Sequence, residues 1–293
     1  MFSVVITTKD RVQFLRRAIS SISMASVVPT DIVIINDGGI AISESMFESE
    51  NVSFTIINHE LSKGANYCRN LGIDLAKEEL VFLLDDDDAV TFDSFKTRLK
   101  AFDDEDVGIS YTGIKIVLDS NLSQVKRQSI PKPINSYYPE ILKCGNLIGS
   151  TSRVALRKRW FYEAGMFDES LPCFQDYDLW IRMTKICKVS TDLDAGIYYT
   201  IHEKGQQISS NYEKYLLTSD YLLNKYRSEL LSSSSLNAFR SHLYLRVAIA
   251  GCGNNSFIKL KFSLLSFFYK PSFRSLALFL LPTSLLKRFF NFV

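Results

Sequence analysis

Residues 80–88 read Leu80-Val81-Phe82-Leu83-Leu84-Asp85-Asp86-Asp87-Asp88, and this stretch decides the fold. Its five apolar residues are typical of a strand buried in a parallel sheet. The four acids stand where that strand leaves the sheet, and ligands bind at this carboxyl edge in open α/β sheets. Adjacent carboxylates repel one another unless a cation neutralises them, and hard oxygen ligands suit Mg²⁺ or Mn²⁺. The alternative is a solvated acidic turn.

Strand-like and helix-like segments alternate before and after this stretch. Apolar, β-branched runs predict strands, and apolar residues at helical spacing predict helices. The predicted strands are residues 2–7, 31–35, 52–57 and 80–84, and the predicted helices are residues 11–24, 64–77 and 91–102. In the helix at 64–77 the expected inner positions are Ala65, Cys68, Leu71, Ile73 and Leu75. The alternation predicts an α/β fold with a doubly wound, mainly parallel central sheet.

The rest of the chain has a different character. Strands are predicted at residues 107–118, 148–154 and 189–200, the last broken by Asp192-Leu193-Asp194, and short helices at 157–164 and 177–185. From residue 209 onward the pattern is helical, with the serine run 232–235 as a joint. We therefore expect a domain at residues 1–208, with halves 1–103 and 104–208, and a helical C-terminal extension at 209–293.

Charge is distributed unevenly along the 293 residues. The net charge is +2, but Glu229 is the last acid, so the residues after it carry +8 and the chain up to and including Glu229 carries −6. This asymmetry favours an anionic surface as a partner of the tail. The five cysteines form no CxxC pair, which favours reduced thiols in the cytosol. We expect no signal peptide, no membrane-spanning helix and no nucleic-acid partner.

Polar residues of complementary types follow the other predicted strands. Thr7 and Asp10 follow the first strand, Asp37 follows the second, and Lys63 and Arg69 stand at the start of a helix. The carboxyl ends of parallel strands meet at one edge, so these segments can form one pocket with the acids. Aspartates that accept hydrogen bonds from a base or ribose, and cations that meet phosphate, suit a nucleotide diphosphate. The alternatives are turn chemistry for Asp37 and an ordinary surface role for Arg69.

A second acidic segment, Gln175-Asp176-Tyr177-Asp178-Leu179-Trp180, begins a predicted helix. An aspartate there can cap the helix or stabilise its dipole. A carboxylate at a helix start beside a pocket can also act as a general base toward a hydroxyl, so both roles stay open for Asp176. His202 is one of only three histidines, and it can be structural or a metal ligand.

In their order, these segments resemble the motifs of family 2 glycosyltransferases. The resemblance covers roughly residues 2–208. The family patterns are V-I-P-T-Y-N-R at residues 4–11, V-V-D-D-G-S at 34–39, G-x-x-x-A-R-N-x-G at 63–72, L-D-x-D-D at 84–88 and E-D-x-D-L-W at 175–180. The chain departs from them with Thr7 for Pro, Lys9 for Tyr, Asn36 for the first Asp and Gln175 for Glu.

The resemblance implies a GT-A fold and a set of roles at the site. Residues 1–103 would be the nucleotide-sugar-binding half, and residues 104–208 the acceptor half with the catalytic base. The donor nucleotide would be bound by Thr7, Asp10, Asp37, Lys63, Arg69, Asp85 and Asp86, with Asp37 at the uracil or ribose and Asp85 at the ribose. Asp87 and His202 would hold Mn²⁺ or Mg²⁺, and Asp176 would deprotonate the acceptor hydroxyl in a single inverting displacement.

The expected function is therefore that of a metal-dependent inverting glycosyltransferase. It would move a sugar from a nucleotide-diphosphate sugar, with UDP favoured, to a glycan or lipid-linked acceptor in cell-surface polysaccharide synthesis (O-antigen, capsule or lipopolysaccharide). The alternative is a catalytically silent nucleotide-sugar-binding or scaffold protein, which Gln175 favours. A glycosidase, which needs two acids flanking one bond, leaves Asp37, Lys63 and Arg69 without a role.

The end of the chain, residues 257–293, is rich in Leu and Phe interleaved with basic residues. Such a segment suits an anionic membrane interface. We expect a cytoplasmic protein held peripherally on the inner membrane. The alternative is a helix packed on the enzyme core or on another subunit, and self-association of the chain stays open.

Overall fold

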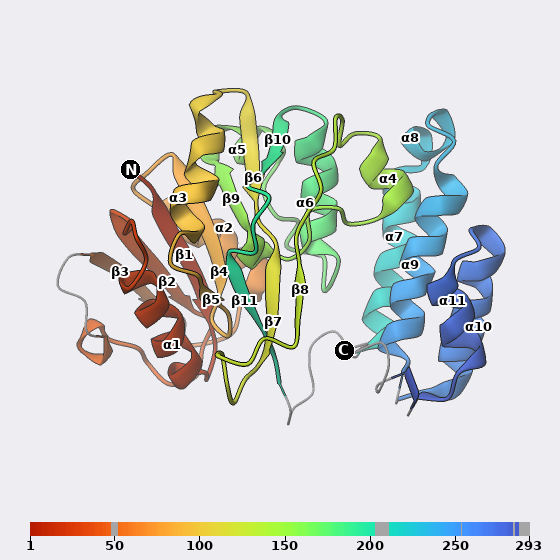
Figure 1. Cartoon of the computed structure of the whole chain (residues 1–293), viewed down its shortest axis with the longest axis horizontal. Coiled ribbons are helices and arrows are strands. Elements are labelled where there is room, and N and C mark those ends of the chain that lie inside the picture. Colours follow the sequence, from red (N-terminus) through yellow and green to blue (C-terminus); the bar gives the residue numbers. More distant parts are fainter. Residues whose placement is uncertain (48–51, 203–210, 253, 284, 287–293) are drawn as a thin grey trace. The chain divides into compact units, whose positions relative to one another are not determined.

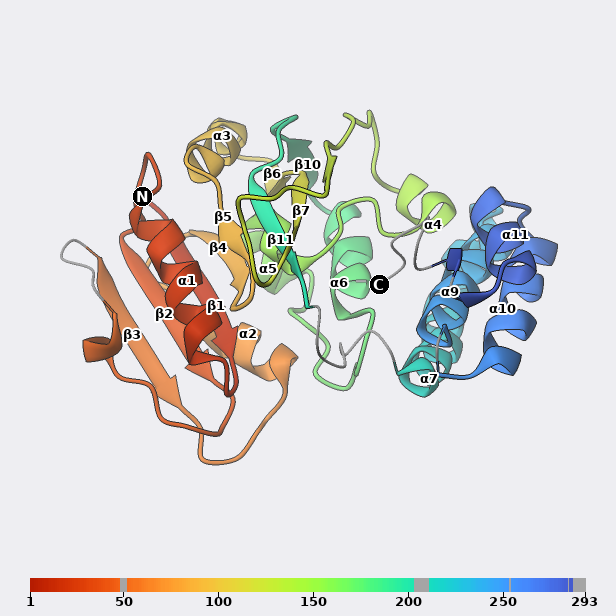
Figure 2. The same cartoon turned by 60° about the horizontal axis from the view of Figure 1, so that its bottom comes forward.

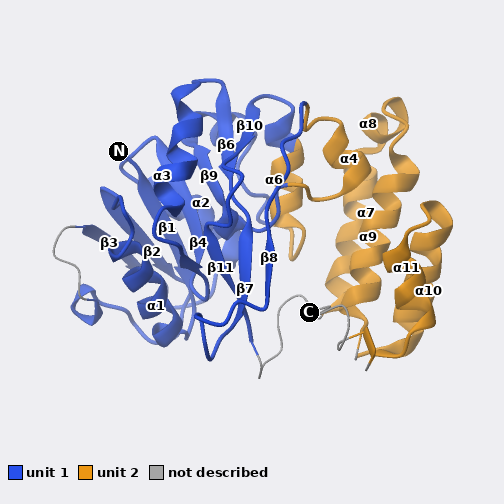
Figure 3. Cartoon of the chain, in the orientation of Figure 1, with its two compact units in different colours: residues 1–135, 148–169, 182–203 blue, residues 136–147, 170–181, 204–293 orange. Residues whose placement is uncertain are grey.

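The computed structural model describes residues 1–47, 52–202, 211–252, 254–283 and 285–286 (Figure 1). The chain divides into two compact units (Figure 3). Unit 1 consists of Met1–Asn135, Ile148–Glu169 and Arg182–Glu203, and unit 2 of Ser136–Leu147, Ser170–Ile181 and Lys204–Val293. The predicted domain boundary after residue 208 stays a prediction.

Unit 1 is built on a central sheet of seven strands. In spatial order these are β10 (Lys188–Thr191), β6 (Val107–Tyr111), β9 (Val154–Arg157), β4 (Leu80–Asp85), β1 (Ser3–Thr8), β2 (Asp31–Asn36) and β3 (Ser53–Asn58). All neighbouring pairs run parallel except those that β9 forms with β4 and β6. The predicted α/β fold with a mainly parallel sheet is confirmed.

A smaller sheet of four strands completes unit 1. Its order is β5 (Ala89–Val90), β11 (Ile197–Ile201), β7 (Ile114–Leu118) and β8 (Arg127–Ser129). β7 and β11 pair in parallel, and both outer pairs are antiparallel. β5 begins only four residues after the end of β4, so residues 86–88 connect the two sheets.

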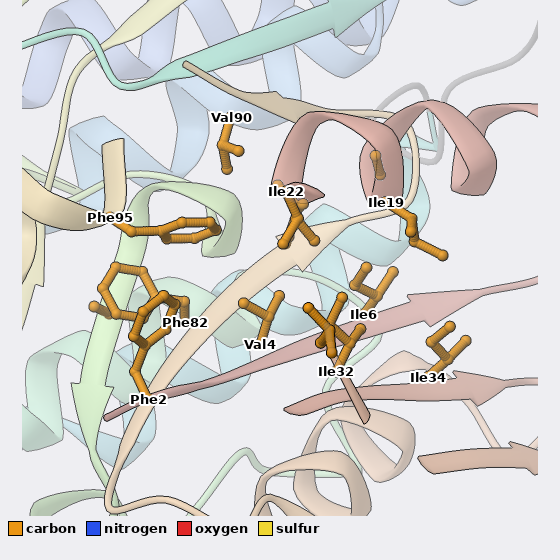
Figure 4. Close-up of a cluster of buried hydrophobic side chains, with 14 of the residues drawn as sticks. Phe2, Val4, Ile6, Ile19, Ile22, Ile32, Ile34, Phe82, Val90 and Phe95 are labelled. Carbon is orange, nitrogen blue, oxygen red and sulfur yellow. The ribbon is translucent and has the colours of Figure 1, made fainter. Parts of the chain in front are cut away.

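Helices cover both faces of the central sheet because β1 and β2 are apolar on both sides. α1 (Val12–Ser23) buries Leu15, Ala18, Ile19 and Ile22, and it lies along β1 and β2 in both views (Figures 1 and 2). α3 (Ser94–Leu99) adds Phe95 to the same cluster. Figure 4 shows this cluster, with Val4 and Ile6 of β1, Ile32 and Ile34 of β2, and Ile19 and Ile22 of α1. Since side chains alternate along a strand, the residues between these face the opposite side.

α2 (Ala65–Leu75) covers that opposite face. A Cβ atom at Gly72 would lie 2.4 Å from Cγ1 of Val5, so the glycine permits the close packing of α2 on β1. α2 also corrects a prediction in part. Cys68 and Ile73 are buried as predicted, but Ala65 and Leu75 are exposed, and the polar residues Asn66, Arg69 and Asn70 are buried as well. α5 (Lys158–Glu163) buries Phe161.

Two predicted strands are placed differently in the structure. The strand expected at 107–118 is two strands, β6 and β7, which belong to different sheets and are separated by Thr112 and Gly113. A Cβ atom at Gly113 would lie 2.2 Å from the carbonyl oxygen of Ser129, so the chain passes between the sheets at a point with no room for a side chain. The strand expected at 148–154 lies later, as β9, after a 3₁₀ turn at Thr151–Arg153.

Unit 2 is helical, as the tail pattern predicts. Its helices are α4 (Glu140–Cys144), the first part of α6 (Gln175–Thr184), α7 (Tyr212–Lys225), α8 (Arg227–Ser232), α9 (Leu236–Ala250), α10 (Ser256–Tyr269) and α11 (Phe273–Leu280). The ring of Phe239 in α9 stacks on Tyr177 of α6, with centroids 5.6 Å apart. No helix in the described part of the chain is long and apolar enough to cross a membrane.

Candidate active site

The strand register of unit 1 places the predicted ligands at one edge of the central sheet. Thr7 of β1 pairs with Asp85 of β4, and Thr8 of β1 pairs with Asn36 of β2. The three strands run parallel, so they end at the same edge. Thr7 is half-buried there beside Asp85, and the acid run continues from this point.

Asp85 is held by groups from two other segments. Nη2 of Arg69 lies 2.8 Å from Oδ1 of Asp85, and the hydroxyl of Thr151 lies 3.1 Å from both of its carboxylate oxygens. The main-chain N–H of Asp85 donates to Oγ of Ser152. Arg69 itself is buried, and its Nη1 has no hydrogen-bond partner among the described residues. A buried guanidinium nitrogen without a partner is expensive, so Nη1 marks a point where an oxygen atom of a ligand would be stabilised.

Asp86 is bound to the end of β1. It accepts a hydrogen bond of 2.7 Å from the hydroxyl of Thr8, and Nη1 of Arg11 lies 3.3 Å from its other oxygen. Burial raises the pKa of Asp86 to about 6, although the Thr8 hydroxyl opposes the rise; repulsion from Asp87 adds to it. The carboxyl is thus directed into the protein, and its predicted contact with the nucleotide stays a prediction.

Asp87 contacts the predicted histidine. Its Oδ2 lies 2.8 Å from Nε2 of His202 and 2.9 Å from Nη1 of Arg11. The other ring nitrogen of His202, Nδ1, lies 3.4 Å from Oδ2 of Asp119. The ring of Phe14 meets the imidazole edge-on, with centroids 5.0 Å apart. His202 is therefore oriented by contacts on three sides, with Nε2 toward Asp87.

Asp88, the last acid of the run, points into the core of unit 1. It is buried, and its Oδ1 accepts a hydrogen bond of 2.9 Å from the main-chain N–H of Thr200 in β11. Burial and the neighbouring Asp87 raise the pKa of Asp88 well above the usual value of an aspartate. Asp88 thus joins the end of β4 to the smaller sheet and is a structural member of the run.

Two arginines near the start of α1 were missed by the sequence analysis. Arg11 bridges Asp86 and Asp87, and Nη2 of Arg17 donates to the main-chain oxygen of Asp87 and to the hydroxyl of Thr200. Arg11 follows directly after the predicted ligand edge, which was an available signal. Arg17 lies inside a helix, where nothing in the local sequence indicates its partners.

Asp37 organises the segment before α2. Its carboxylate accepts hydrogen bonds from the hydroxyl of Ser62, at 2.6 Å, and from the main-chain N–H groups of Lys63 and Gly64, at 2.6 and 3.2 Å. Burial alone would raise the pKa of Asp37, but these bonds and one from the thiol of Cys68 lower it below the usual value. Asp37 is therefore ionised and directed at the N-terminal end of α2.

Lys63 and Asp10 occupy the rim of the same edge. The ammonium group of Lys63 lies over the ring of Tyr67, 4.8 Å from its centroid. Oδ1 of Asp10 accepts a hydrogen bond of 3.3 Å from the N–H of Ile40. A Cβ atom at Gly39, whose φ is +88°, would collide with the Asp10 carboxylate, so only glycine allows this contact. The structure thus brings the predicted nucleotide-binding residues of unit 1 to one edge.

The pair of Asp87 and His202 can be tested for its fit to a divalent cation. Neighbouring ligands of an octahedral ion, each about 2.1 Å from it, are about 3.0 Å apart. Oδ2 and Nε2 are joined by a hydrogen bond of 2.8 Å, which an ion would replace, and this separation is close to that value. No group of three or more His, Cys, Asp or Glu side chains that could hold a metal occurs among the described residues. The pair therefore fits an ion whose other ligands are substrate phosphates and water, which is the usual way Mg²⁺ is bound.

Asp176, the predicted general base, belongs to unit 2. It is the second residue of α6, and its carboxylate accepts hydrogen bonds from the side-chain amide of Asn146, at 3.1 Å, and from the N–H of Tyr177, at 2.8 Å. The bond to Tyr177 satisfies one of the free N–H groups in the first turn, so the predicted capping interaction is partly present. The bond from Asn146 orients the carboxylate without neutralising its charge.

Asp178 has a structural role within unit 2. It is buried, and its Oδ1 lies 2.7 Å from Nζ of Lys225 and 2.7 Å from the hydroxyl of Tyr226. These contacts fasten the start of α6 to the end of α7. In addition to any dipole effect in the first turn, Asp178 therefore forms a specific ion pair.

Comparison with known proteins shows similarity to glycosyltransferases at the level of the family and of individual relatives. The family model described as Glycosyl transferase family 2 matches residues 3–165. An uncharacterized glycosyltransferase of Rickettsia felis is 27% identical over 225 residues, which are 73% of this chain and 36% of that protein. The uncharacterized glycosyltransferase YwdF of Bacillus subtilis is 25% identical over 213 residues, 71% of this chain and 77% of the relative. The match thus spans about a third of the Rickettsia protein and most of the Bacillus protein.

Solved structures share the fold at low sequence identity. TarS of S. aureus, solved in complex with UDP-GlcNAc, has a TM-score of 0.59 and 14% identity, with 95% of this chain and 89% of that chain covered. The mannosyltransferase PcManGT of Pyrobaculum calidifontis, solved with GDP-Man and Mn²⁺, has a TM-score of 0.57 and 12% identity, with 99% and 81% covered. These similarities support a GT-A type architecture.

Proposed function

The chain belongs to glycosyl transferase family 2, and from this membership we propose that it is a metal-dependent, inverting enzyme that uses a nucleotide-diphosphate sugar. It is a glycosyltransferase. The finer proposal is that the donor is a UDP-sugar, that the acceptor is a hydroxyl of a glycan or lipid-linked saccharide, and that the product enters a cell-surface polysaccharide. The observation that carries the metal-dependent part of the proposal is the 2.8 Å contact between Asp87 and His202, at the sheet edge where Arg69 and Asp37 lie.

We assign binding of the nucleotide-sugar donor to residues of unit 1. Asp37 and Asp85 would accept hydrogen bonds from the base or ribose, and Nη1 of Arg69 would donate to an oxygen atom of the nucleotide. Asp87 and His202 would hold a divalent cation, which would neutralise charge on the departing diphosphate. Arg11 keeps a positive charge beside the same Asp87 oxygen and would add to this neutralisation.

The acceptor end falls to Asp176. Its carboxylate would take the proton of the acceptor hydroxyl as that oxygen bonds to the anomeric carbon. The bond from this carbon to the diphosphate oxygen would break in the same step, which inverts the configuration. Gln175 leaves no second carboxylate at the adjacent position, and Asn146 supplies a neutral hydrogen bond to Asp176.

A membrane location follows from the proposed acceptor. A lipid-linked saccharide is confined to a membrane, and the basic, apolar tail would bring the enzyme to the cytoplasmic face of the inner membrane. The attachment we propose is peripheral, through the basic and apolar residues of the tail.

The test combines donor binding with turnover in the full-length protein. UDP-, GDP- and dTDP-sugars with Mn²⁺ would be screened by thermal shift, and nucleotide release would then be measured for the donor that stabilises most. We expect Asp176→Asn to bind the donor normally but to lower turnover by about 10²–10⁴-fold, the usual contribution of a general base. Asp87→Asn should lose the Mn²⁺-dependent part of the thermal shift. Asp106→Asn, at an exposed aspartate, is the matched control.

Two results would contradict the proposal in different ways. Normal turnover in Asp176→Asn would exclude this residue as the base. Tight nucleotide binding without turnover for any acceptor would favour the alternative of a silent nucleotide-sugar-binding protein, to which Gln175 points.

A further inference from the structure

The outward side of α10 is apolar. Phe257, Leu260, Leu264 and Phe268 recur at intervals of three and four residues, which places them in one stripe along the helix. All four side chains are exposed, Phe257 to 70% and Phe268 to 79%. Single exposed apolar residues are ordinary, but a continuous stripe of large ones indicates a surface that binds something apolar.

The inward side of the same helix is small or polar except for Phe262, whose ring meets that of Tyr244 edge-on, with centroids 5.2 Å apart. Ser263 and Ser266 are fully buried, and Ser266 exchanges hydrogen bonds of 2.8 and 2.9 Å with Ser241 of α9, through side-chain and main-chain atoms of both residues. Lys259 is 5% exposed and donates to the carbonyl oxygen of Leu281, just after α11. α10 is thus packed on its neighbours through one aromatic ring, two small serines and polar bonds.

α11 repeats this arrangement. Ser275, Ala277 and Leu278 are buried, whereas Leu276 and Leu280 are exposed, so Phe262 and Leu278 are the only large apolar residues of the described helices α10 and α11 that are buried. In water-soluble bundles the large apolar side chains face inward and the polar ones outward. Small residues and serine hydrogen bonds between helices, with large apolar residues outside, are typical of helices packed in contact with lipid.

The charge around these helices specifies the kind of lipid. Lys261, Lys270 and Arg274 are exposed, and no acid follows Glu229 in the chain. Lys287 and Arg288 of the predicted basic tail lie outside the described residues. Positive residues without opposing acids match an anionic headgroup layer. At about 1.5 Å per residue, the 14 residues of α10 reach about 21 Å, which is less than the roughly 30 Å of a hydrocarbon core, so α10 lies along a bilayer rather than across it.

We infer that the apolar stripe of α10 and the exposed leucines of α11 insert into the surface of an anionic phospholipid bilayer, with Lys261, Lys270 and Arg274 against its headgroups. The inference rests on the membrane attachment in the proposed function and assigns specific side chains to it. It does not depend on the chemistry of sugar transfer. The buried serines, together with Phe262 and Leu278, explain how α10 and α11 can pack firmly while their other large apolar side chains stay available for lipid.

The experiment measures vesicle binding by the full-length protein. Flotation would use vesicles of phosphatidylcholine alone and of phosphatidylcholine mixed with phosphatidylglycerol. The test variant is Leu260→Ser/Leu264→Ser/Phe268→Ser, and the matched control is Leu217→Ser, a 72% exposed leucine of α7 in the same unit. Since the triple variant lacks three of the apolar side chains that would insert, we expect it to bind anionic vesicles at least about a hundredfold more weakly than the wild type. Wild type and Leu217→Ser should bind alike, more tightly with phosphatidylglycerol and less tightly in high salt.

Several outcomes would overturn the inference. The inference is wrong if the wild-type protein binds neither kind of vesicle. It is also wrong if the triple variant binds vesicles as tightly as the wild type does. A wild-type dimer that becomes a monomer in the triple variant, without vesicle binding in either, would make the stripe a contact between copies of this chain instead. Unchanged melting temperatures would show that the variants fold. Nucleotide release is measured separately without vesicles; its absence alongside the expected vesicle binding would refute the transferase proposal and support the lipid surface.

Discussion

Replacing Arg69 by methionine tests whether the contact between α2 and the acid run stabilises unit 1. The guanidinium group of Arg69 is buried and lies 2.8 Å from Asp85, whose side chain is 29% exposed. Methionine keeps much of the volume but removes the charge. Asp85 would then keep its hydrogen bonds from Thr151 and lose its ion-pair partner.

The expected loss follows from the burial of the pair. Two unit charges at 2.8 Å attract by about 6 kcal/mol at an effective dielectric constant of about 20, before the cost of desolvation. Removing one partner of a fully buried pair costs about 3–5 kcal/mol. Water reaches Asp85 in part, so we expect Arg69→Met to lower the free energy of unfolding by about 2–3 kcal/mol. That corresponds to a melting temperature lower by about 5–10 °C.

The assay is urea denaturation of the full-length protein, with hydrogen exchange on peptides of β4 to assign the loss to unit 1. Arg16→Met, at an exposed arginine of α1, is the control and should change stability by less than about 0.5 kcal/mol. The double variant Arg69→Met/Asp85→Asn should be about 1–2 kcal/mol more stable than the sum of the single losses predicts. An Arg69→Met protein as stable as the wild type, or a cycle without coupling, would refute the reasoning.

Three further predictions concern stability. Burial lowers the pKa of His242 below its ordinary 6.5, so the unfolded chain takes up a proton at a higher pH than the folded protein does. The free energy of unfolding should therefore fall as the pH drops below about 6.5, by at most about 1.4 kcal/mol per pH unit. Urea midpoints of His242→Gln should lack this dependence on pH. Asp178→Asn should lower the free energy of unfolding by about 3 kcal/mol because Lys225 loses its buried partner. A double-mutant cycle with Lys225→Met should show positive coupling, and additive losses of stability in the two single variants would contradict the ion pair. Gly72→Ala should cost about 1–3 kcal/mol by overpacking against Val5, and a thermal melt equal to that of the wild type would disprove the close contact.

The parts of the fold that the sequence predicts well are those whose signal is local. β1, β2 and β4 are short apolar runs, and the parallel register then brings their ends together wherever helices connect them. The acid run and Asp37 could therefore be assigned to one edge without coordinates. The resemblance to a family added the roles of these residues but not their partners.

The buried face of α2 shows what local patterns cannot supply. Asn70 is buried because its side-chain amide donates to the carbonyl oxygen of Phe167 and its side-chain oxygen accepts from the N–H of Phe167, about a hundred residues away. Asn66 likewise donates to the carbonyl oxygen of Asp168. Each of these two side chains is satisfied by a distant main-chain segment, so hydrophobic periodicity identified Cys68 and Ile73 on the inner face of this helix but missed its polar residues. Arg17 escaped prediction for the same reason.

The hydrogen bonds of Asp37 affect how a mutational scan of this site should be interpreted. One carboxylate fastens Ser62, Lys63 and Gly64, which form the approach to α2, and α2 carries Arg69. Truncation of Asp37 to alanine would therefore remove any direct contact with a ligand and also loosen the segment that presents a second binding residue. A lost affinity in Asp37→Ala would overstate the direct contribution of that side chain. Ser62→Ala removes one of the fastening bonds and leaves the carboxylate in place, so it isolates the contribution of local order from that of recognition.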